Sequence, residues 1–292
     1  MRYAGIDLHG KYSVVSIVDS AGKRICEDRL PNDATEVDRF FRRFTPIRAV
    51  VESTGNWHWF FDTLQESGVQ ACLAHPYQVK AIASARLKND RVDARILAHL
   101  LRSNLVPECY VPSPEIRTLR ELVRYRVALV RLQSGLKRRL RALLAKRNLK
   151  IEARTLDSRR GREELKAFQV DARARQEIDQ VLGLLEHMHR CELEVNREIR
   201  KKGGADPRIE LLESVPGVGE FLALLILAEI GEIDRFASAR KLTSYAGIVP
   251  ATRSSGGHTY YGRITKQGSR WLRWAVIEAV MHAPDPPALI FF

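Results

Sequence analysis

Between Pro114 and Pro207 the chain contains no internal proline, and apolar residues recur at spacings of three, four and seven. A first set comprises Leu122, Leu129, Leu132, Leu136, Leu140 and Leu143. A second comprises Ile178, Leu182, Leu185, Met188, Val195 and Ile199, with the polar Glu192 among them. These spacings predict two long amphipathic helices, which we expect to form a coiled-coil hairpin or a helix-mediated dimer contact.

The segment 117–160, which includes most of the first of these helices, holds nearly all of the net positive charge of the chain. Fifteen Lys and Arg residues lie between 117 and 160 against three acids, whereas the net charge of the whole chain is +13. A solvated helix face usually carries both signs, so a concentrated basic stripe favours a polyanionic partner. We therefore expect this segment to bind nucleic acid. Its candidate phosphate contacts are Lys137, Arg138, Arg139 and Arg141.

Composition argues against several other classes of protein. Apolar residues make up 45% and charged residues 28%, as in ordinary globular proteins. No run approaches the roughly 18 uncharged apolar residues of a membrane span, and the N-terminus lacks the pattern of a signal peptide. The four cysteines form no CxxC pair, which argues against a disulfide framework or a cysteine-rich zinc site. We expect a cytoplasmic protein without a membrane partner.

The first hundred residues predict an α/β domain. Strand-like segments at 2–8, 12–20 and 24–30 precede a helix near 34–44, a strand at 48–53, a helix at 57–67, a strand at 69–74 and a helix-rich stretch at 77–103. This order is that of an RNase H-like domain, although it is not unique to that fold. We place the domains at 1–110, 111–206 (the basic helical coiled coil) and 207–292, the last one mostly helical.

Four acids form the sharpest constellation of the α/β domain. Asp7 lies in the first strand, Glu52 ends a later strand, and Asp90 and Asp93 are three residues apart, hence on one face of a helix. Mg²⁺ takes carboxylate oxygens, and two ions about 3.5–4 Å apart stabilise both the attacking and the leaving oxygen in phosphoryl transfer. The four acids therefore predict a site for Mg²⁺ or Mn²⁺.

Each acid also has a structural explanation. An acid at the end of a strand often has no metal-binding role. The two helix acids have basic neighbours that could neutralise them: Lys88, Arg91 and Arg95. Four acids in this order within one α/β domain favour the metal site. We expect two nearby histidines, His9 and His58, to pack the rim of the site rather than to bind metal.

Two segments of the third domain indicate contact with phosphate. LLESVPGVGEFLA (211–223) matches a helix-hairpin-helix, in which Gly217 and Gly219 permit a tight turn and the next helix offers free N–H groups. A glycine turn between two packed helices would look the same, and we favour contact with DNA.

The other segment, TRSSGGHTYYGRITKQGSRWLR (252–273), contains a predicted glycine- and serine-rich loop at 253–262. Basic neighbours could hold a scissile phosphate beside Ser254 or Ser255 and stabilise its charge. The loop is flanked by Arg253, His258, Arg263, Lys266 and Arg270, of which Arg253, Arg263 and Lys266 are the candidate phosphate contacts. From the residues alone, a phosphate-binding loop without catalysis is favoured over a nucleophile.

Taken together, these segments resemble transposases of the insertion sequence 110 family and the related site-specific DNA invertases. GIDLHGKYSVVSIVD, VVESTGNW and LKNDRVDARILAHLL resemble the DEDD, RuvC-like domain of that family. The stretch from SVPGVGEF to KQGSRWLR resembles its carboxy-terminal transposase domain. The resemblance covers nearly the whole chain, and the pairing of both halves in this order is highly specific.

The resemblance implies a DNA strand-cleaving and strand-exchanging enzyme. Asp7, Glu52, Asp90 and Asp93 match the family's metal-binding tetrad, and Ser255, with Ser254 as the alternative, matches its catalytic serine. The resemblance also implies a covalent serine–DNA intermediate. It implies a composite active site in which the two domains come from different subunits. The implied partners are DNA, a structured noncoding guide RNA for some members, and further copies of the chain in a homodimer or homotetramer.

One segment departs from the family pattern. Family members commonly continue with basic helical sequence after WLRWAVIEAV, whereas this chain has MHAPDPPALIFF, which we interpret as a truncated or frame-shifted copy. Two other functions stay open. A RuvC-like nuclease or junction resolvase would use the carboxylates only and dispense with Ser255. A non-enzymatic nucleic-acid-binding protein would use the acids structurally.

Overall fold

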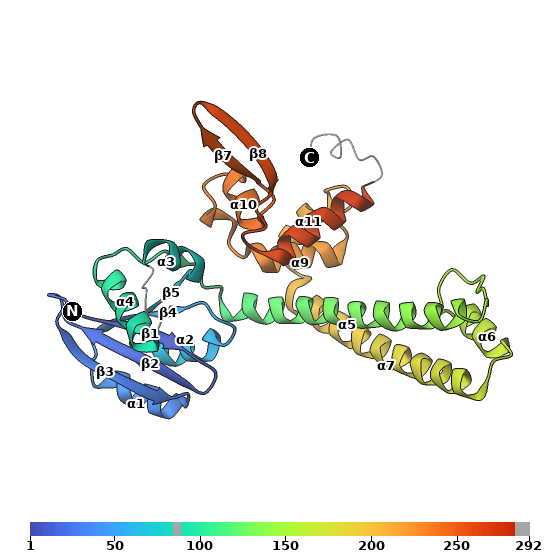
Figure 1. Ribbon diagram of the computed structural model, residues 1–292, viewed down its shortest axis with the longest axis horizontal. Helices are drawn as coiled ribbons and strands as arrows, with labels where there is room; N and C mark the ends of the chain where they lie inside the picture. Colours follow the sequence, from blue (N-terminus) through green and yellow to red (C-terminus); the bar gives the residue numbers. More distant parts are fainter. Residues whose placement is uncertain (84–88, 284–292) are drawn as a thin grey trace. The chain divides into compact units, whose positions relative to one another are not determined.

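The computed structural model describes residues 1–83 and 89–283. The chain divides into two compact units, the first from Met1 to Val111 and the second from Pro112 onward. Figure 1 shows the elements of both units along the chain. Each unit is described by itself.

A six-stranded mixed sheet forms the centre of the first unit. Its strands are β1 (Arg2–Leu8), β2 (Tyr12–Val18), β3 (Arg24–Pro31), β4 (Ile47–Glu52), β5 (Gln70–Ala74) and β6 (Glu108–Cys109), in the order β3-β2-β1-β4-β5-β6. β1, β2 and β3 form an antiparallel meander, while β4 and β5 run parallel to β1. This confirms the predicted α/β architecture. The two-residue strand β6 is an addition that no sequence pattern indicated.

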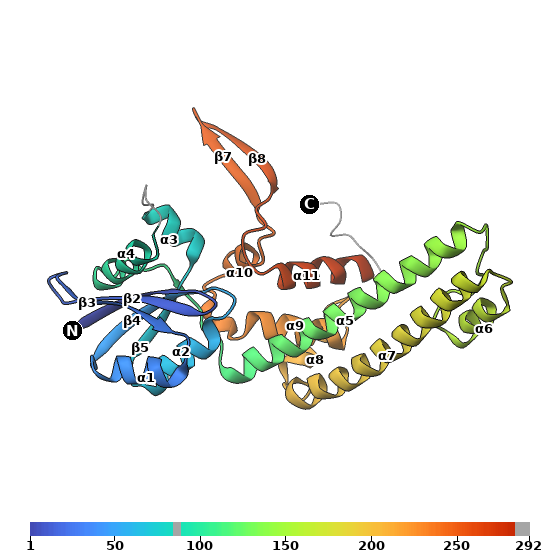
Figure 2. The same ribbon diagram turned by 60° about the horizontal axis from the view of Figure 1, so that its bottom comes forward.

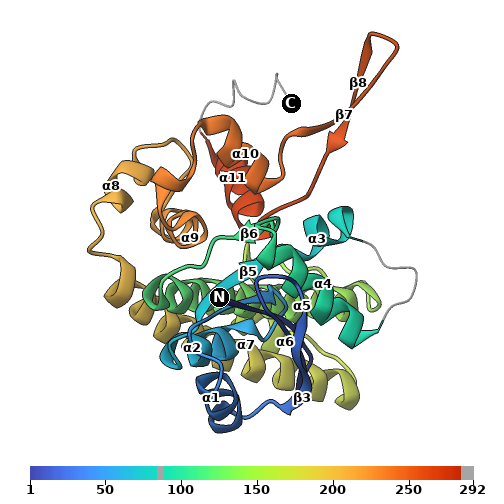
Figure 3. The same cartoon turned by 90° about the vertical axis from the view of Figure 1, so that its left-hand side faces the viewer.

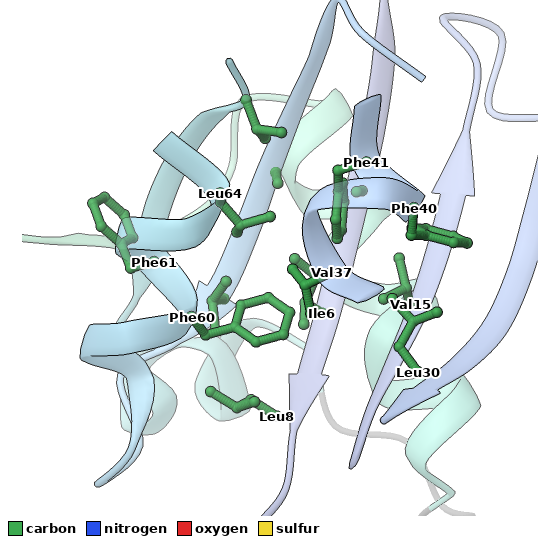
Figure 4. Close-up of a cluster of buried hydrophobic side chains, with 14 of the residues drawn as sticks. Ile6, Leu8, Val15, Leu30, Val37, Phe40, Phe41, Phe60, Phe61 and Leu64 are labelled. Atoms are coloured by element: carbon green, nitrogen blue, oxygen red, sulfur yellow. The ribbon is translucent and has the colours of Figure 1, made fainter. Parts of the chain in front are cut away.

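Helices cover both faces of this sheet. They are α1 (Ala34–Arg42), α2 (Trp57–Glu66), α3 (Pro76–Ile82) and α4 (Asp90–Arg102). α1 and α2 lie on one side of the strands and α4 on the other (Figures 2 and 3). Ile6, Val37 and Phe60 belong to the core beneath α1 and α2 (Figure 4), whereas Val50 packs with the residues of α4. Because the inner strands are buried on both faces, they appear in the sequence as continuous apolar runs.

α4 lies in direct backbone contact with β1, and Gly5 makes this contact possible. A Cβ atom built on Gly5 would lie 2.0 Å from the carbonyl oxygen of Ala94 and 2.3 Å from the amide nitrogen of Ala98. An ion pair of 2.7 Å between Arg95 and Glu27 of β3 holds the same helix to the sheet. The first turn of α4 is thereby brought to the end of β1.

Two long antiparallel helices dominate the second unit. They are α5 (Pro114–Ala145) and α7 (Ala172–Gly203), which lie side by side with α6 (Arg159–Ala167) between them in the chain (Figures 1 and 2). The predicted helical hairpin is confirmed within one chain. Leu132, predicted in the apolar seam, is 58% exposed, and the neighbouring Gln133 is buried instead, donating to Glu192 at 2.8 Å. The predicted seam already included Glu192, but the spacing did not indicate Gln133 as its partner.

The remaining elements pack on the base of this hairpin. They are α8 (Arg208–Glu213), α9 (Glu220–Ile230), η1 (Ile233–Arg235), α10 (Ala239–Ala246), β7 (Pro250–Ser255), β8 (His258–Ile264) and α11 (Arg270–His282). α9 is apolar on all sides because it is surrounded by α5, α8 and α11. Its one charged core residue, Glu229, is 1% exposed and accepts hydrogen bonds from Arg124 and Ser269.

The segment 253–262, which we predicted as a loop, forms a two-stranded hairpin instead. β7 and β8 are joined by Gly256 and Gly257, both of which have positive φ angles (58° and 80°). Two residues in this conformation make the turn that matches the twist of a β-ribbon. The ribbon projects from the helices of its unit (Figure 1), and nearly all of its residues are exposed.

Within residues 1–83 and 89–283, no helix is long and apolar enough to cross a membrane. The carboxy-terminal segment that we interpreted as a truncation lies mostly at 284–292, outside the described residues.

Gly5→Ala should displace α4 and destabilise the first unit by more than about 2 kcal/mol, because rigid backbone atoms cannot yield to the new methyl group. Urea unfolding measures the loss. Gly10→Ala is the matched control, since nothing lies within 4 Å of a Cβ there. Equal stability of the two variants would show that α4 does not approach β1 this closely.

Candidate active site

The two strand acids lie at one edge of the sheet. Ile6 of β1 pairs with Val51 of the parallel strand β4, so Asp7 and Glu52 follow side by side at the carboxyl ends of these strands. Both residues are half-buried. Carboxyl ends of parallel strands are where ligands commonly bind in α/β sheets.

The two helix acids occupy the first turn of α4. Asn89 caps this helix by accepting a hydrogen bond from the amide of Arg91, and Asp90 and Asp93 follow directly. The partial positive charge of a helix N-terminus favours carboxylates there. The basic neighbours Arg91 and Arg95 pair with Glu27. The third, Lys88, lies outside the described residues.

Asp7 and Asp90 meet at His9. The Nε2 atom of His9 lies 3.2 Å from a carboxylate oxygen of each, and the three side chains place one ligand atom apiece within 4.8 Å of one another. This Nε2 is buried and makes no well-aligned hydrogen bond within the described part of the chain. Two carboxylate oxygens and an imidazole nitrogen form a donor set that suits a divalent cation. Glu52 and Asp93 lie outside this group.

Burial raises the pKa of Asp7, and the nearby negative charges of Asp90 and Asp93 raise it further, while His9 opposes them. Asp93 therefore acts electrostatically on the site. A carboxylate that is costly to ionise in the folded protein gains from a cation beside it. The residues present thus fit a divalent ion.

Several positioning residues escaped the sequence analysis. The Asn32 and Asn56 side-chain amides both donate to the backbone carbonyl of His9, at 2.7 and 2.9 Å, and hold the turn after β1. The hydroxyl of Tyr12 donates to Asp90 at 3.0 Å, which raises the pKa of Tyr12. No local pattern marks these contacts, because they join residues from different elements.

The β7–β8 ribbon separates the two candidate serines. Residues paired across a ladder lie on the same face, and neighbours along a strand lie on opposite faces. Ser255 pairs with His258 and Arg253 with Tyr260, so these four residues share one face. Ser254 lies on the other face, where its hydroxyl and that of Thr259 are 3.0 Å apart.

The glycine turn before α9 has a packing role. Gly217 has a φ of 85°, and a Cβ on it would lie 2.0 Å from the carbonyl oxygen of Ala279 in α11. Gly219, by contrast, is the N-cap residue of α9, and nothing lies within 4 Å of a Cβ built on it. The hollow beside the turn, about 510 Å³, is lined by Glu213, Glu220 and Glu278 among others. This acidic lining favours the packing explanation over contact with phosphate, and DNA contact at the two glycines stays a prediction.

The four predicted phosphate contacts on α5 fall into two pairs. Lys137 forms an ion pair with Asp157 at 2.9 Å, and Arg139 forms one with Glu177 at 2.8 Å. Arg138 and Arg141 are exposed and form no ion pair with any residue that the structure describes. Part of the basic stripe therefore serves the fold. The ribbon residues Arg253 and Arg263, and Lys266 beyond it, are exposed as well.

Comparisons with known proteins identify the chain. A family model for the DEDD domain of IS110 transposases matches residues 4–148, and one described as "Transposase IS116/IS110/IS902 family" matches residues 209–288. The chain belongs to this family of transposases.

Relatives of this family align over much of the chain. A "Probable family 20 transposase" of Pseudomonas aeruginosa is 28% identical over 94% of this chain and 81% of its own length. The transposase for insertion sequence element IS1111A of Coxiella burnetii is 26% identical over 78% of this chain and 63% of its own. The chain is thus similar to transposases on both sides of its unit boundary, and it is a transposase-family enzyme with a DEDD-type domain.

Asp7→Asn should stabilise the metal-free transposase at pH 7, because it removes a carboxylate that is costly to ionise in the folded state. The folded-state pKa of Asp7 lies above its usual 3.8, so the stabilising contribution of Asp7 is present at low pH and is lost as the pH rises through that pKa. The advantage of Asn should therefore shrink as the pH falls towards 4. Urea unfolding in EDTA measures it, with Asp179→Asn on the exposed face of α7 as the control. A variant less stable than wild type at pH 7 would contradict this electrostatic explanation.

The exposed arginines should contribute more DNA affinity than the paired ones. Replacing Arg138 and Arg141 with Gln should flatten the plot of log K against log salt by nearly two units, about one for each phosphate that the variant no longer neutralises. Replacing Lys137 and Arg139 should flatten it less, because their charges are compensated within the fold. Fluorescence anisotropy with duplex DNA measures both slopes. A larger effect from the second pair would reverse the assignment.

Proposed function

We propose that this transposase cleaves and exchanges DNA strands with a metal-dependent carboxylate site and a serine nucleophile. The observation that carries the proposal is the convergence of Asp7, His9 and Asp90 at the carboxyl edge of the DEDD-domain sheet. Asp7 and Asp90 would hold Mg²⁺ or Mn²⁺ together with His9, which we predicted only at the rim of the site. Glu52 and Asp93, which lie outside this group, stay the predicted further oxygen ligands. Such ions, when bound, stabilise negative charge on the attacking and leaving oxygens.

Ser255 is the nucleophile in this proposal. Its Oγ attacks the scissile phosphorus, the bond from phosphorus to one bridging oxygen breaks, the hydroxyl proton passes to a base, and the leaving oxygen takes up a proton. The protein is then esterified to DNA, which conserves the bond for rejoining. Ser255 shares its face of the ribbon with Arg253 and His258, and a guanidinium there suits a phosphate. Ser254 is paired with Thr259 on the other face.

The partners follow from the family and from the basic surface. We propose that a structured noncoding RNA selects the DNA. We also propose that the chain acts as a homodimer or homotetramer, so that a serine and an acidic site from different copies can serve one phosphate. The exposed basic residues of α5 provide phosphate-binding capacity for either nucleic acid.

The test is formation of a covalent adduct. Purified protein with Mg²⁺, element-end DNA and the adjacent noncoding RNA should yield a serine-linked DNA adduct on denaturing gels. Ser255→Ala should abolish both adduct and strand exchange while leaving DNA binding intact, and Asp7→Ala should abolish them through loss of the metal site.

Ser254→Ala is the matched control, since it removes the same hydroxyl from the opposite face of the ribbon. Loss of the adduct in Ser254→Ala but not in Ser255→Ala would exchange their roles. Full activity in both variants would overturn the serine mechanism and favour a nuclease that uses the carboxylates only.

A further inference from the structure

Three arginines converge on one tryptophan of the second unit. The guanidinium carbons of Arg124 and Arg131 of α5 lie 5.8 and 5.1 Å from the ring centroid of Trp271 in α11, and that of Arg270 lies 4.9 Å away. We call these four residues the Trp271 cluster. It joins segments about 140 residues apart in the chain. Arg124 and Arg131 belong to the basic segment 117–160 and Arg270 and Trp271 to the stretch 252–273, but none of them is among the acidic residues or the four α5 contacts described above.

The charges of the Trp271 cluster are only partly compensated. Arg124 donates to both carboxylate oxygens of Glu229, at 2.8 and 3.0 Å. Arg131 and Arg270 are exposed, and the described residues offer neither of them an ion pair. Two cations held against one ring repel each other. An anion seated between them would offset that repulsion.

Cation–π contact does not prevent an arginine from binding phosphate. A guanidinium that stacks on an aromatic ring keeps its N–H edge available for bidentate contact with phosphate. The ring holds the guanidinium in place by cation–π attraction, which lowers the ordering cost of binding. α11 begins at Arg270, capped by Ser269, so the partial positive charge of its N-terminus adds to the cluster.

A row of arginines continues from this cluster along α5. The exposed Arg131 and Arg138 are spaced by seven residues, which places them on one face of the helix, about 10 Å apart, and Arg124, already bound to Glu229, lies seven residues before them. A row of this kind fits a repeating anion better than a single one. A nucleic-acid backbone supplies phosphates in such a series.

We propose that Arg131 and Arg270, both in cation–π contact with Trp271, form a clamp for a phosphodiester backbone that continues along α5 to Arg138. The inference rests on the proposed function in taking nucleic acid as the partner. It adds a binding site formed by α5 and the first turn of α11.

The experiment measures equilibrium binding across a range of NaCl concentrations. Arg131→Gln/Arg270→Gln is compared with wild type by fluorescence anisotropy on three probes of equal length: duplex DNA, single-stranded DNA and a structured RNA. The matched control is Arg190→Gln/Arg197→Gln, which removes the same charge from exposed positions of α7. Thermal melting checks that both double variants keep the wild-type fold.

The clamp predicts that Arg131→Gln/Arg270→Gln weakens binding by at least about tenfold near physiological salt and flattens the salt slope by nearly two units on at least one probe. The control should change both values much less. Loss on the RNA probe alone would assign the clamp to RNA, and loss on a DNA probe would assign it to DNA.

An unchanged salt slope, or an equal loss in the control, would overturn the clamp. The adduct assay with Ser255→Ala keeps the two proposals separable. If the clamp variant loses affinity while wild type forms no serine adduct, the clamp stands and the catalytic proposal fails. If the adduct forms and the clamp variant binds normally, the reverse holds.

Discussion

The acidic site depends on the contact between the backbones of α4 and β1. Asp90 comes from a helix and Asp7 from a strand, and they can face a common cation only if the helix lies directly on the sheet. Gly5 permits that approach, because any side chain there would meet the carbonyl of Ala94. The ion pair between Arg95 and Glu27 then fixes the helix along its length. A residue without a side chain thus determines where the carboxylates of α4 lie.

The second unit shows how a strongly basic chain divides its charge between folding and binding. Arg120 and Arg124 bind the carbonyl groups and the carboxylate at the end of α9, and thereby attach α5 to the helices that follow. Lys137 and Arg139 stabilise the long hairpin through ion pairs. A buried carboxylate such as Glu229 is tolerable only when it is paired and hydrogen-bonded. The basic side chains that form no ion pair with the described residues, such as Arg138 and Arg141, are the ones available to bind phosphate.

The sequence predicted much of this architecture because its main signals are local. Apolar runs predicted the strands, and the three-, four- and seven-residue spacings predicted α5 and α7. The order of elements predicted the fold of the first unit. The ribbon at Ser254 and Ser255 was missed, although Gly-Gly between residues with β propensity is a hairpin signal. The residues that position the site could not be predicted from the sequence, for another reason. Asn32, Asn56 and Tyr12 act through contacts that only the folded chain brings together.

The proposed chemistry requires that Asp7 and Asp90 hold a divalent metal ion on which strand cleavage depends. Crystals soaked in Mn²⁺ and measured at the manganese absorption edge show whether they do. We expect an anomalous peak within about 2.5 Å of carboxylate oxygens of both Asp7 and Asp90, and no such peak in Asp7→Asn crystals treated in the same way. Manganese bound only elsewhere, or a peak that survives Asp7→Asn unchanged, would contradict this metal site.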